Sequence, residues 1–190
     1  FEGLSLLDYA INATLALSNI IIKKGDRAGM ITFQHKVSTV LPASKRNKQM
    51  QLIQESLYNQ KTLYKEADYS RLFVTVKRKL TQRSLLILFT NFESMAALER
   101  QLPYFSNLAK NHVLVVVFFE NTELKGLLES RPKSLKDIYY KTIAEKYDHE
   151  KRLIVKELRK HGIYSVLTPP QDLTVNTINK YLELKSRGLV

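Results

Sequence analysis

The sequence contains no cysteine. This absence excludes a disulfide framework, a thiolate zinc site and a cysteine nucleophile. No apolar run approaches the roughly 20 residues that a membrane-spanning helix needs. Common enzyme motifs are also missing, namely the glycine-rich phosphate loops, the GxSxG elbow and the HExxH helix. We therefore expect a chain that is not an enzyme.

A strong excess of positive charge is present instead. The 190 residues carry a formal net charge of +12. Residues 45–83 hold ten Lys or Arg against three acids, and residues 131–160 hold ten against five. A solvated basic surface accounts for this charge, whereas an anionic membrane, an acidic partner or nucleic acid would make use of it.

Hydrophobic periodicity predicts an alternation of helices and strands over a single domain, residues 1–190. We expect helices over 4–24, 70–80, 122–130, 135–160 and 173–187, with others starting at Asn47 and Met95, and a polar loop over 59–68. Strands are expected over 27–33, 37–41, 84–90, 113–119 and 163–168, with Pro42 ending the second. This order predicts an α/β fold of three layers, a mostly parallel sheet with one antiparallel edge strand and helices on both faces.

The long helix over 135–160 has an apolar series along one side. The series predicts a buried face made of Leu135, Ile138, Tyr139, Ile143, Tyr147, Ile154 and Leu158. We expect local, structural roles for the four histidines, which share no spacing, and for Asp8 and Asp26, which suit a helix cap and a turn.

Ligands of open α/β sheets bind beyond the carboxyl ends of the strands. The candidate residues there are Ser70, Thr90 and Asn91, with Glu93, Asn121 and Thr122 nearby in the sequence pattern. Their oxygen atoms suit a hard cation such as Mg²⁺, but the same residue types cap helices. Because these positions are mainly neutral, metal-assisted hydrolysis is disfavoured.

Four sequence blocks resemble the bacterial "domain of unknown function fifty-eight" family. They are Gly3–Ala10, Lys24–Phe33, Ser84–Asn91 and His112–Val117, and the tail Tyr181–Gly188 is similar to that family's end. The resemblance implies a von Willebrand factor type A-like, Rossmann-like domain. Such domains hold a divalent cation at a metal-ion-dependent adhesion site, built from an Asp-x-Ser-x-Ser loop, a hydroxyl before a helix and an Asp after a later strand.

The resemblance places the second and third pieces of this site on Ser70 and on Asn91, within Thr90-Asn91. The first piece would precede Phe1, so we expect an N-terminally truncated fragment that lacks the first strand of the fold and could dimerise through the open sheet edge. Asn keeps an oxygen ligand but removes a negative charge. We therefore expect no cofactor, and at most weak Mg²⁺ binding at Ser70 and Asn91.

The resulting hypothesis is a non-catalytic protein-interaction module with a degenerate metal site. The resemblance implies a MoxR-type AAA+ ATPase as partner in protein assembly or maturation. It is consistent with a cytoplasmic domain on a parent anchored in the bacterial inner membrane, where anionic lipid could be contacted. The alternative is a nucleic-acid-binding domain or degenerate nuclease that uses the basic surface.

Overall fold

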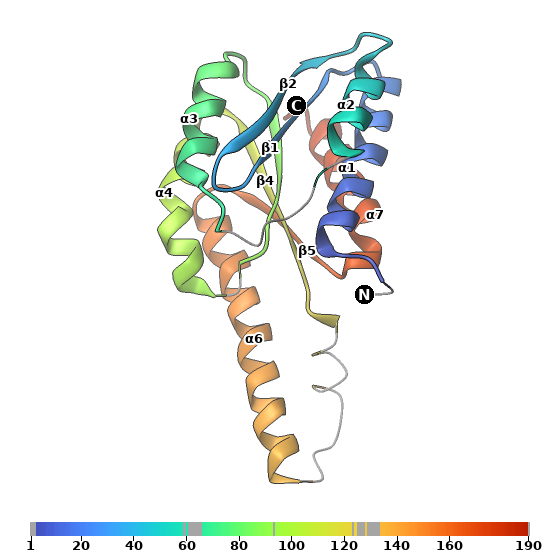
Figure 1. Cartoon of the computed structure of the whole chain (residues 1–190). Coiled ribbons are helices and arrows are strands. Elements are labelled where there is room, and N and C mark those ends of the chain that lie inside the picture. Colours follow the sequence, from blue (N-terminus) through green and yellow to red (C-terminus); the bar gives the residue numbers. More distant parts are fainter. Residues whose placement is uncertain are drawn as a thin grey trace. The chain divides into compact units, whose positions relative to one another are not determined.

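The computed structural model describes residues 3–58, 60, 66–92, 94–122, 124, 128 and 134–189. The chain is a mixture of helices and strands (Figure 1) and divides into two compact units. The first unit comprises residues 1–84 and 171–190, and the second comprises residues 85–170. Among the described helices, none combines the length and the hydropathy needed to cross a bilayer.

The described part of the first unit contains four α-helices and a β-hairpin. Its elements are α1 (Leu6–Lys23), β1 (Ala28–Phe33), β2 (Val37–Ser44), α2 (Gln49–Tyr58), α3 (Tyr69–Lys79) and α7 (Leu173–Ser186). The predicted cap of α1 is confirmed, because Ser5 and Asp8 form a reciprocal capping box. The core of the first unit contains Ala28, Ile53 and Leu57, and apolar side chains of α1 pack against them. Helices α1 and α7 lie against each other.

Strand β2 continues past Pro42 to Ser44, so the prediction that Pro42 ends the strand is wrong. In the described sheet β2 pairs only with β1, and the register between them shifts between Ala28 and Met30. An edge strand at a bulge tolerates the missing N–H of proline. Gly29 lies opposite this irregularity, where an added Cβ would stand 2.6 Å from the backbone nitrogen of Ala43.

The second unit is built on a parallel sheet of three strands. Its elements are β3 (Leu85–Phe89), α4 (Met95–Asn111), β4 (Val113–Phe119), α6 (Leu135–Lys160) and β5 (Tyr164–Thr168). The sheet order is β3-β4-β5. All seven residues of β4 are buried, as expected for the central strand of a covered parallel sheet. A short 3₁₀ turn, η1 (Pro170–Asp172), precedes α7.

Helix α6 is longer than the sheet on which it packs. Its 26 residues span about 39 Å, whereas a strand of seven residues spans about 23 Å. Its first half therefore extends beyond the strands (Figure 1), and Leu135 is 86% exposed and Tyr139 65% exposed. The predicted buried face is thus confirmed at Ile154 and Leu158, both fully buried, and Ile143 is half-buried. The prediction is wrong for the exposed side chains of Leu135, Ile138, Tyr139 and Tyr147.

The two sheets are separate in the described part of the chain, one antiparallel and one parallel. Strands β1 and β3 each have a single hydrogen-bonded neighbour there. The α/β class is confirmed. The three-layer arrangement around a single sheet, the single domain and the missing first strand stay predictions. The predicted loop over 59–68, the helix over 122–130 and Glu93 lie wholly or largely outside the described residues.

Candidate functional site

Ser70 lies in the first turn of α3, where it supports the cap of that helix. The carboxylate of Asp68 accepts hydrogen bonds from the Ser70 hydroxyl at 2.6 Å and from the backbone N–H of Arg71 at 3.0 Å. These two donors lower the pKa of Asp68 below its ordinary value. The backbone N–H of Asp68 also donates to the carbonyl of Gln34, which joins the start of α3 to the hairpin turn. The hydroxyl of Ser70 therefore has a structural use.

Thr90 and Asn91 follow β3, as predicted. The backbone N–H of Thr90 donates to the carbonyl of Val117 at 3.0 Å, which continues the pairing of β3 with β4 by one residue. The side chain of Thr90 is half-buried and that of Asn91 is exposed. Asn91 thus stands at the carboxyl end of the parallel sheet with one face open to solvent.

The side-chain oxygen of Asn91 accepts a hydrogen bond from Lys151, a residue of α6. The Lys151 ammonium lies 2.7 Å from Asn91 Oδ1, donates to the carbonyl of Phe92 and stands 5.5 Å from the ring centroid of Phe118. Lys151 is only 8% exposed. Charge-assisted hydrogen bonds and a π-face offset part of the cost of burying an ammonium.

Glu150, the residue before Lys151 on α6, contacts the start of α4. Its carboxylate accepts a hydrogen bond from the backbone N–H of Met95 at 2.8 Å, at the first residue of α4. Negative charge is favourable at that helix end. Two successive residues of α6 therefore hold Asn91 and Phe92 after β3 and Met95 at the start of α4.

Sequence reasoning missed Lys151, although a signal was present. Ala144, Lys151, Ile154 and Leu158 form the buried series of α6. A lysine in an apolar series at helical spacing is an anomaly, because lysine is rarely buried without a partner. The spacing marks the position, but it does not identify the partner on another element.

The described residues around Asn91 do not fit a divalent cation. The oxygen that would coordinate the metal already accepts a hydrogen bond from an ammonium, and the ammonium would repel a second cation at this distance. Asn91 also lacks the negative charge that strengthens such sites. The described residues contain no group of three or more His, Cys, Asp or Glu that could hold a metal ion.

The three predicted site residues fall in different units. Ser70 belongs to the first unit, and Thr90 and Asn91 belong to the second. The structure brings Thr90 and Asn91 together with Lys151, and the grouping of these residues with Ser70 stays a prediction. Beyond β4, the side chain of Asn121 accepts a weak hydrogen bond at 3.4 Å from the backbone N–H of Leu124, which is a capping contact.

A hydroxyl, an imidazole and a carboxylate meet on the surface of the second unit. Ser106 Oγ lies 3.3 Å from His161 Nδ1, and His161 Nε2 lies 3.5 Å from Glu157. Glu157 pairs more closely with Lys160, at 2.7 Å, which is also the main cause of its lowered pKa. Ser106 lies in the middle of α4, without the strained turn that exposes a nucleophilic serine. The contacts of Ser106, His161 and Glu157 are therefore better explained as stabilising the C-terminal end of α6 than as a hydrolytic site.

The other histidines are dispersed. His112 is the C-cap of α4, directly before β4, and burial lowers its pKa below the ordinary value. His149 is exposed on α6, and His35 lies in the hairpin turn of the first unit. The expected local role holds for His161, the C-cap of α6.

Asp26 does not behave as the sequence predicts. Its carboxylate accepts hydrogen bonds from the Tyr181 hydroxyl, at 2.6 Å, and from the Lys185 ammonium, both on α7. Lys185 and Tyr181 lower its pKa, in that order. The expectation of purely local turn chemistry is therefore wrong, because the partners lie more than 150 residues away along the chain.

Comparison with known proteins gives one match. The family model described as "Protein of unknown function DUF58" matches residues 5–127, about two thirds of the chain. No curated protein and no solved structure gives a significant match. The matched segment includes Ser70, Thr90 and Asn91 but ends before α6, which supplies Lys151.

Proposed function

Because the chain belongs to the family described as protein of unknown function DUF58, we propose that it is a non-catalytic protein-interaction module. The proposal includes the finer fold assignment, a von Willebrand factor type A-like domain with a degenerate adhesion site. It also includes the partner that the resemblance implies, a MoxR-type AAA+ ATPase engaged in protein assembly or maturation. The binding surface is the carboxyl edge of β3, around Thr90 and Asn91.

The contact between Lys151 and Asn91 carries this proposal. An adhesion site offers a partner a fixed positive centre, and the buried Lys151 ammonium stands beside Asn91, which the resemblance puts in the metal-ligand position. The positive charge belongs to the Lys151 side chain, so no ion has to bind from solution. Because Lys151 holds Asn91 and Phe92 and Glu150 holds Met95, these residues are preorganised, and a preorganised surface loses less conformational entropy on binding.

The test is direct binding to a purified MoxR-type ATPase from the same organism, measured by biolayer interferometry without nucleotide. The double variant Thr90→Ala/Asn91→Ala is expected to weaken binding at least about tenfold, as for central interface residues. Asn111→Ala is the matched control, since Asn111 is an exposed asparagine at the opposite end of α4. A chelator should leave the wild-type affinity unchanged.

Equal affinity of wild type, double variant and control would disprove the binding surface. No binding of any ATPase form would disprove the partner. Loss of binding on chelation would disprove the metal-independent site. The non-catalytic part has its own test, because a fluorophosphonate probe should not label Ser106, and labelling that disappears in Ser106→Ala would contradict it.

A further inference from the structure

The positive charge of the molecule is concentrated in the first unit. This unit carries seventeen Lys or Arg against eight Asp or Glu, so it accounts for a net charge of +9 out of +12. The second unit, with thirteen against ten, is close to neutral for its size. A general solvated surface would spread the excess more evenly.

One end of the first unit collects most of these charges. Helices α1, α3 and α7 end there, β1 starts there, and β2 runs into α2 there (Figure 1). The pairing of Ala28 with Ser44 and the hydrogen bond from Arg27 to Gln82, at 2.9 Å, bring these segments together. The hairpin turn and the start of α3 lie at the opposite end.

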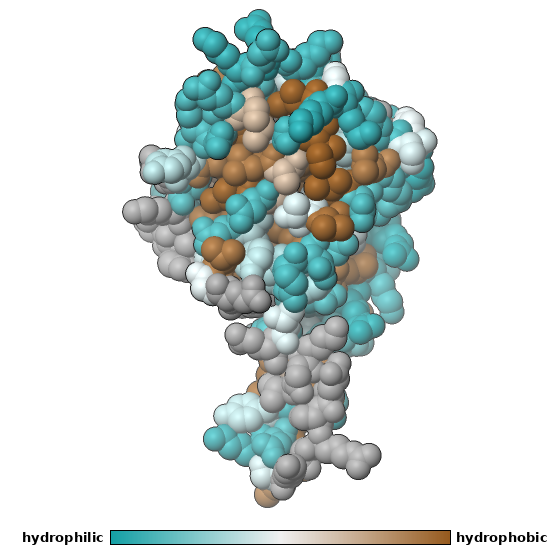
Figure 2. All heavy atoms as spheres, turned by 90° about the vertical axis from the view of Figure 1, so that its right-hand side faces the viewer, coloured by the Kyte–Doolittle hydropathy of each residue, from teal (hydrophilic) through white to brown (hydrophobic). Residues whose placement is uncertain are grey.

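We define the basic end as the exposed Lys and Arg side chains of these segments apart from α7, whose exposed Arg187 is paired with Glu183. Its ten members are Lys23, Lys24, Arg27, Lys45, Arg46, Lys48, Lys77, Arg78, Lys79 and Arg83. Hydrophilic side chains gather at this end of the molecule in Figure 2, with apolar side chains below them.

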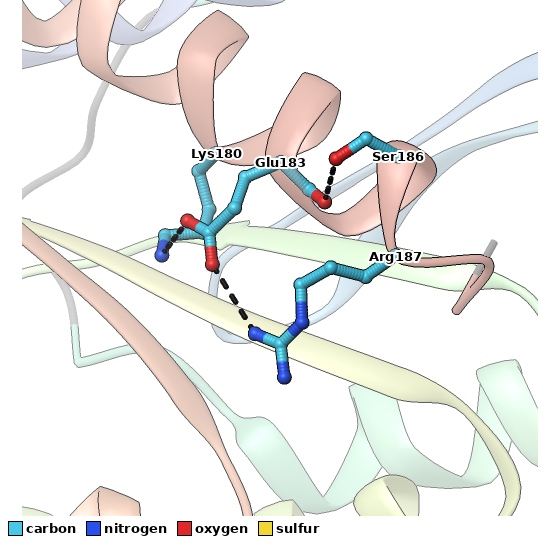
Figure 3. A network of polar contacts seen from close by, with 4 residues as sticks. All are labelled: Lys180, Glu183, Ser186 and Arg187. Atoms are coloured by element: carbon cyan, nitrogen blue, oxygen red, sulfur yellow. Dashed lines mark hydrogen bonds and ion pairs between the residues drawn. The ribbon is translucent and has the colours of Figure 1, made fainter.

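No member of the basic end forms an ion pair with a carboxylate in the part of the chain that the structure describes. The nearby acids are used by α7 itself. Glu183 pairs with Lys180 and Arg187 on its own helix (Figure 3), and Asp26 pairs with Lys185. After Lys185, Lys24 also contributes to the lowered pKa of Asp26, and the other charges of the basic end are left for solvent or for a partner.

Local electrostatics do not account for all of this charge. Cations are favourable at helix C-termini, which explains Lys77, Arg78 and Lys79 in the last turn of α3. Lys45, Arg46 and Lys48 stand instead just before the N-terminus of α2, where cations are unfavourable and acids are preferred. The first turn of α2 contains no acid to compensate.

We propose that the basic end docks the first unit on an anionic lipid bilayer, with Lys45, Arg46 and Lys48 as its central contacts. Charges presented together at the ends of several elements suit a flat surface of headgroup phosphates, to which each Lys or Arg adds attraction. Single-stranded nucleic acid is bound through aromatic stacking. The exposed large side chains of the described residues include no aromatic at this end, since Tyr58 closes the far end of α2.

The proposal is independent of the protein-partner function, and vesicle flotation tests it. Vesicles with about one third phosphatidylglycerol in phosphatidylcholine should bind the chain, pure phosphatidylcholine should not, and binding should fall as NaCl rises from about 0.05 to 0.5 M. Lys45→Gln/Arg46→Gln/Lys48→Gln should lower binding at least about tenfold. Removing these cations should also maintain or raise the thermal midpoint, because the N-terminus of α2 is relieved of unfavourable charge.

A matched control separates the basic end from net charge alone. Lys136→Gln/Lys146→Gln/Lys156→Gln removes three exposed cations from α6 and leaves the same net charge as the first variant. It should bind the anionic vesicles like wild type. Equal losses in both variants, or binding to neutral vesicles, would overturn the proposal. Tighter binding to duplex DNA than to the vesicles at one salt concentration would assign the surface to nucleic acid instead.

Discussion

A neutral amide beside a buried ammonium distinguishes the edge of β3. Asn91 presents its oxygen to Lys151, and a carboxylate at that position would face the same ammonium. The Lys151 ammonium and a bound Mg²⁺ ion are therefore alternatives at this position, because a carboxylate that pairs with Lys151 has little remaining affinity for Mg²⁺. Replacing Asn91 shows which of them the site uses.

Asn91→Asp is expected to raise the free energy of unfolding at pH 7 by up to about 1 kcal/mol, since the new carboxyl pairs with Lys151 but keeps one side in solvent. Pairing lowers the pKa of the new carboxyl below about 3.9. The gain is thus present at neutral pH and is lost as the pH falls through the lowered pKa. Urea unfolding at pH 7 and about pH 3 measures it, with Asn111→Asp as control. Calorimetric Mg²⁺ binding by the variant would contradict the internal-cation assignment.

Asp26 gives a second prediction at this scale. Its lowered pKa means that the carboxylate stabilises the fold above its unfolded pKa, and that this contribution is lost as the pH falls through the lowered value. Because the carboxylate is 39% exposed, Asp26→Asn should cost only about 1 kcal/mol at pH 7. The difference from wild type should vanish in acid. Asp172→Asn is a suitable control, since Asp172 forms no side-chain cap bond. A pH-independent difference would contradict this account.

The candidate site was predictable only in part, for a physical reason. Strand ends follow from apolar runs, so the positions of Thr90 and Asn91 could be read from the chain. The ammonium beside Asn91 comes from a residue 60 positions later, and the partners of Asp26 come from the last helix. Side-chain pairing between distant elements depends on packing, which periodicity does not encode.

At the scale of elements, local patterns determine where helices and strands lie along the chain. They do not determine how much of each helix or strand is buried by the element that packs on it. The strand over Val113–Phe119 and the helix over Leu135–Lys160 agree with the prediction residue for residue. The same apolar series wrongly predicts burial along the whole of α6, because the sheet is shorter than the helix. Length mismatch between packed elements is a tertiary property.

Alanine substitutions along α6 should reveal this difference. Leu158→Ala is expected to lower the free energy of unfolding by about 2–5 kcal/mol, because it leaves a cavity at a fully buried site. Leu135→Ala removes the same atoms from a side chain that is 86% exposed, and should change stability by less than about 0.5 kcal/mol. Urea denaturation of the two variants compares matched chemistry on one helix. Similar losses at both positions would mean that the first half of α6 is covered in solution.

At the scale of the whole molecule, charge and fold are divided between the same two units. The first unit is assembled from the two ends of the chain, since α7 returns to pack on α1. It also holds most of the net charge. Composition alone gives the total of +12, but only the arrangement of the elements places the unpaired cations together.

Such a molecule should become more stable as salt is added. Self-repulsion at the basic end opposes folding and is screened as the Debye length falls from about 14 Å at 0.05 M to about 4 Å at 0.5 M NaCl. The thermal midpoint of wild type should rise over that range. The rise should be smaller for Lys45→Gln/Arg46→Gln/Lys48→Gln than for Lys136→Gln/Lys146→Gln/Lys156→Gln, because acids are interleaved with the cations of α6.

Differential scanning fluorimetry measures how the thermal midpoint of each variant changes with salt. Sodium chloride is preferable to a sulfate salt, because sulfate stabilises proteins by being excluded from their surface. Equal slopes would show that the repulsion depends on total charge, and a midpoint that falls with salt would mean that attractive pairs outweigh the basic end.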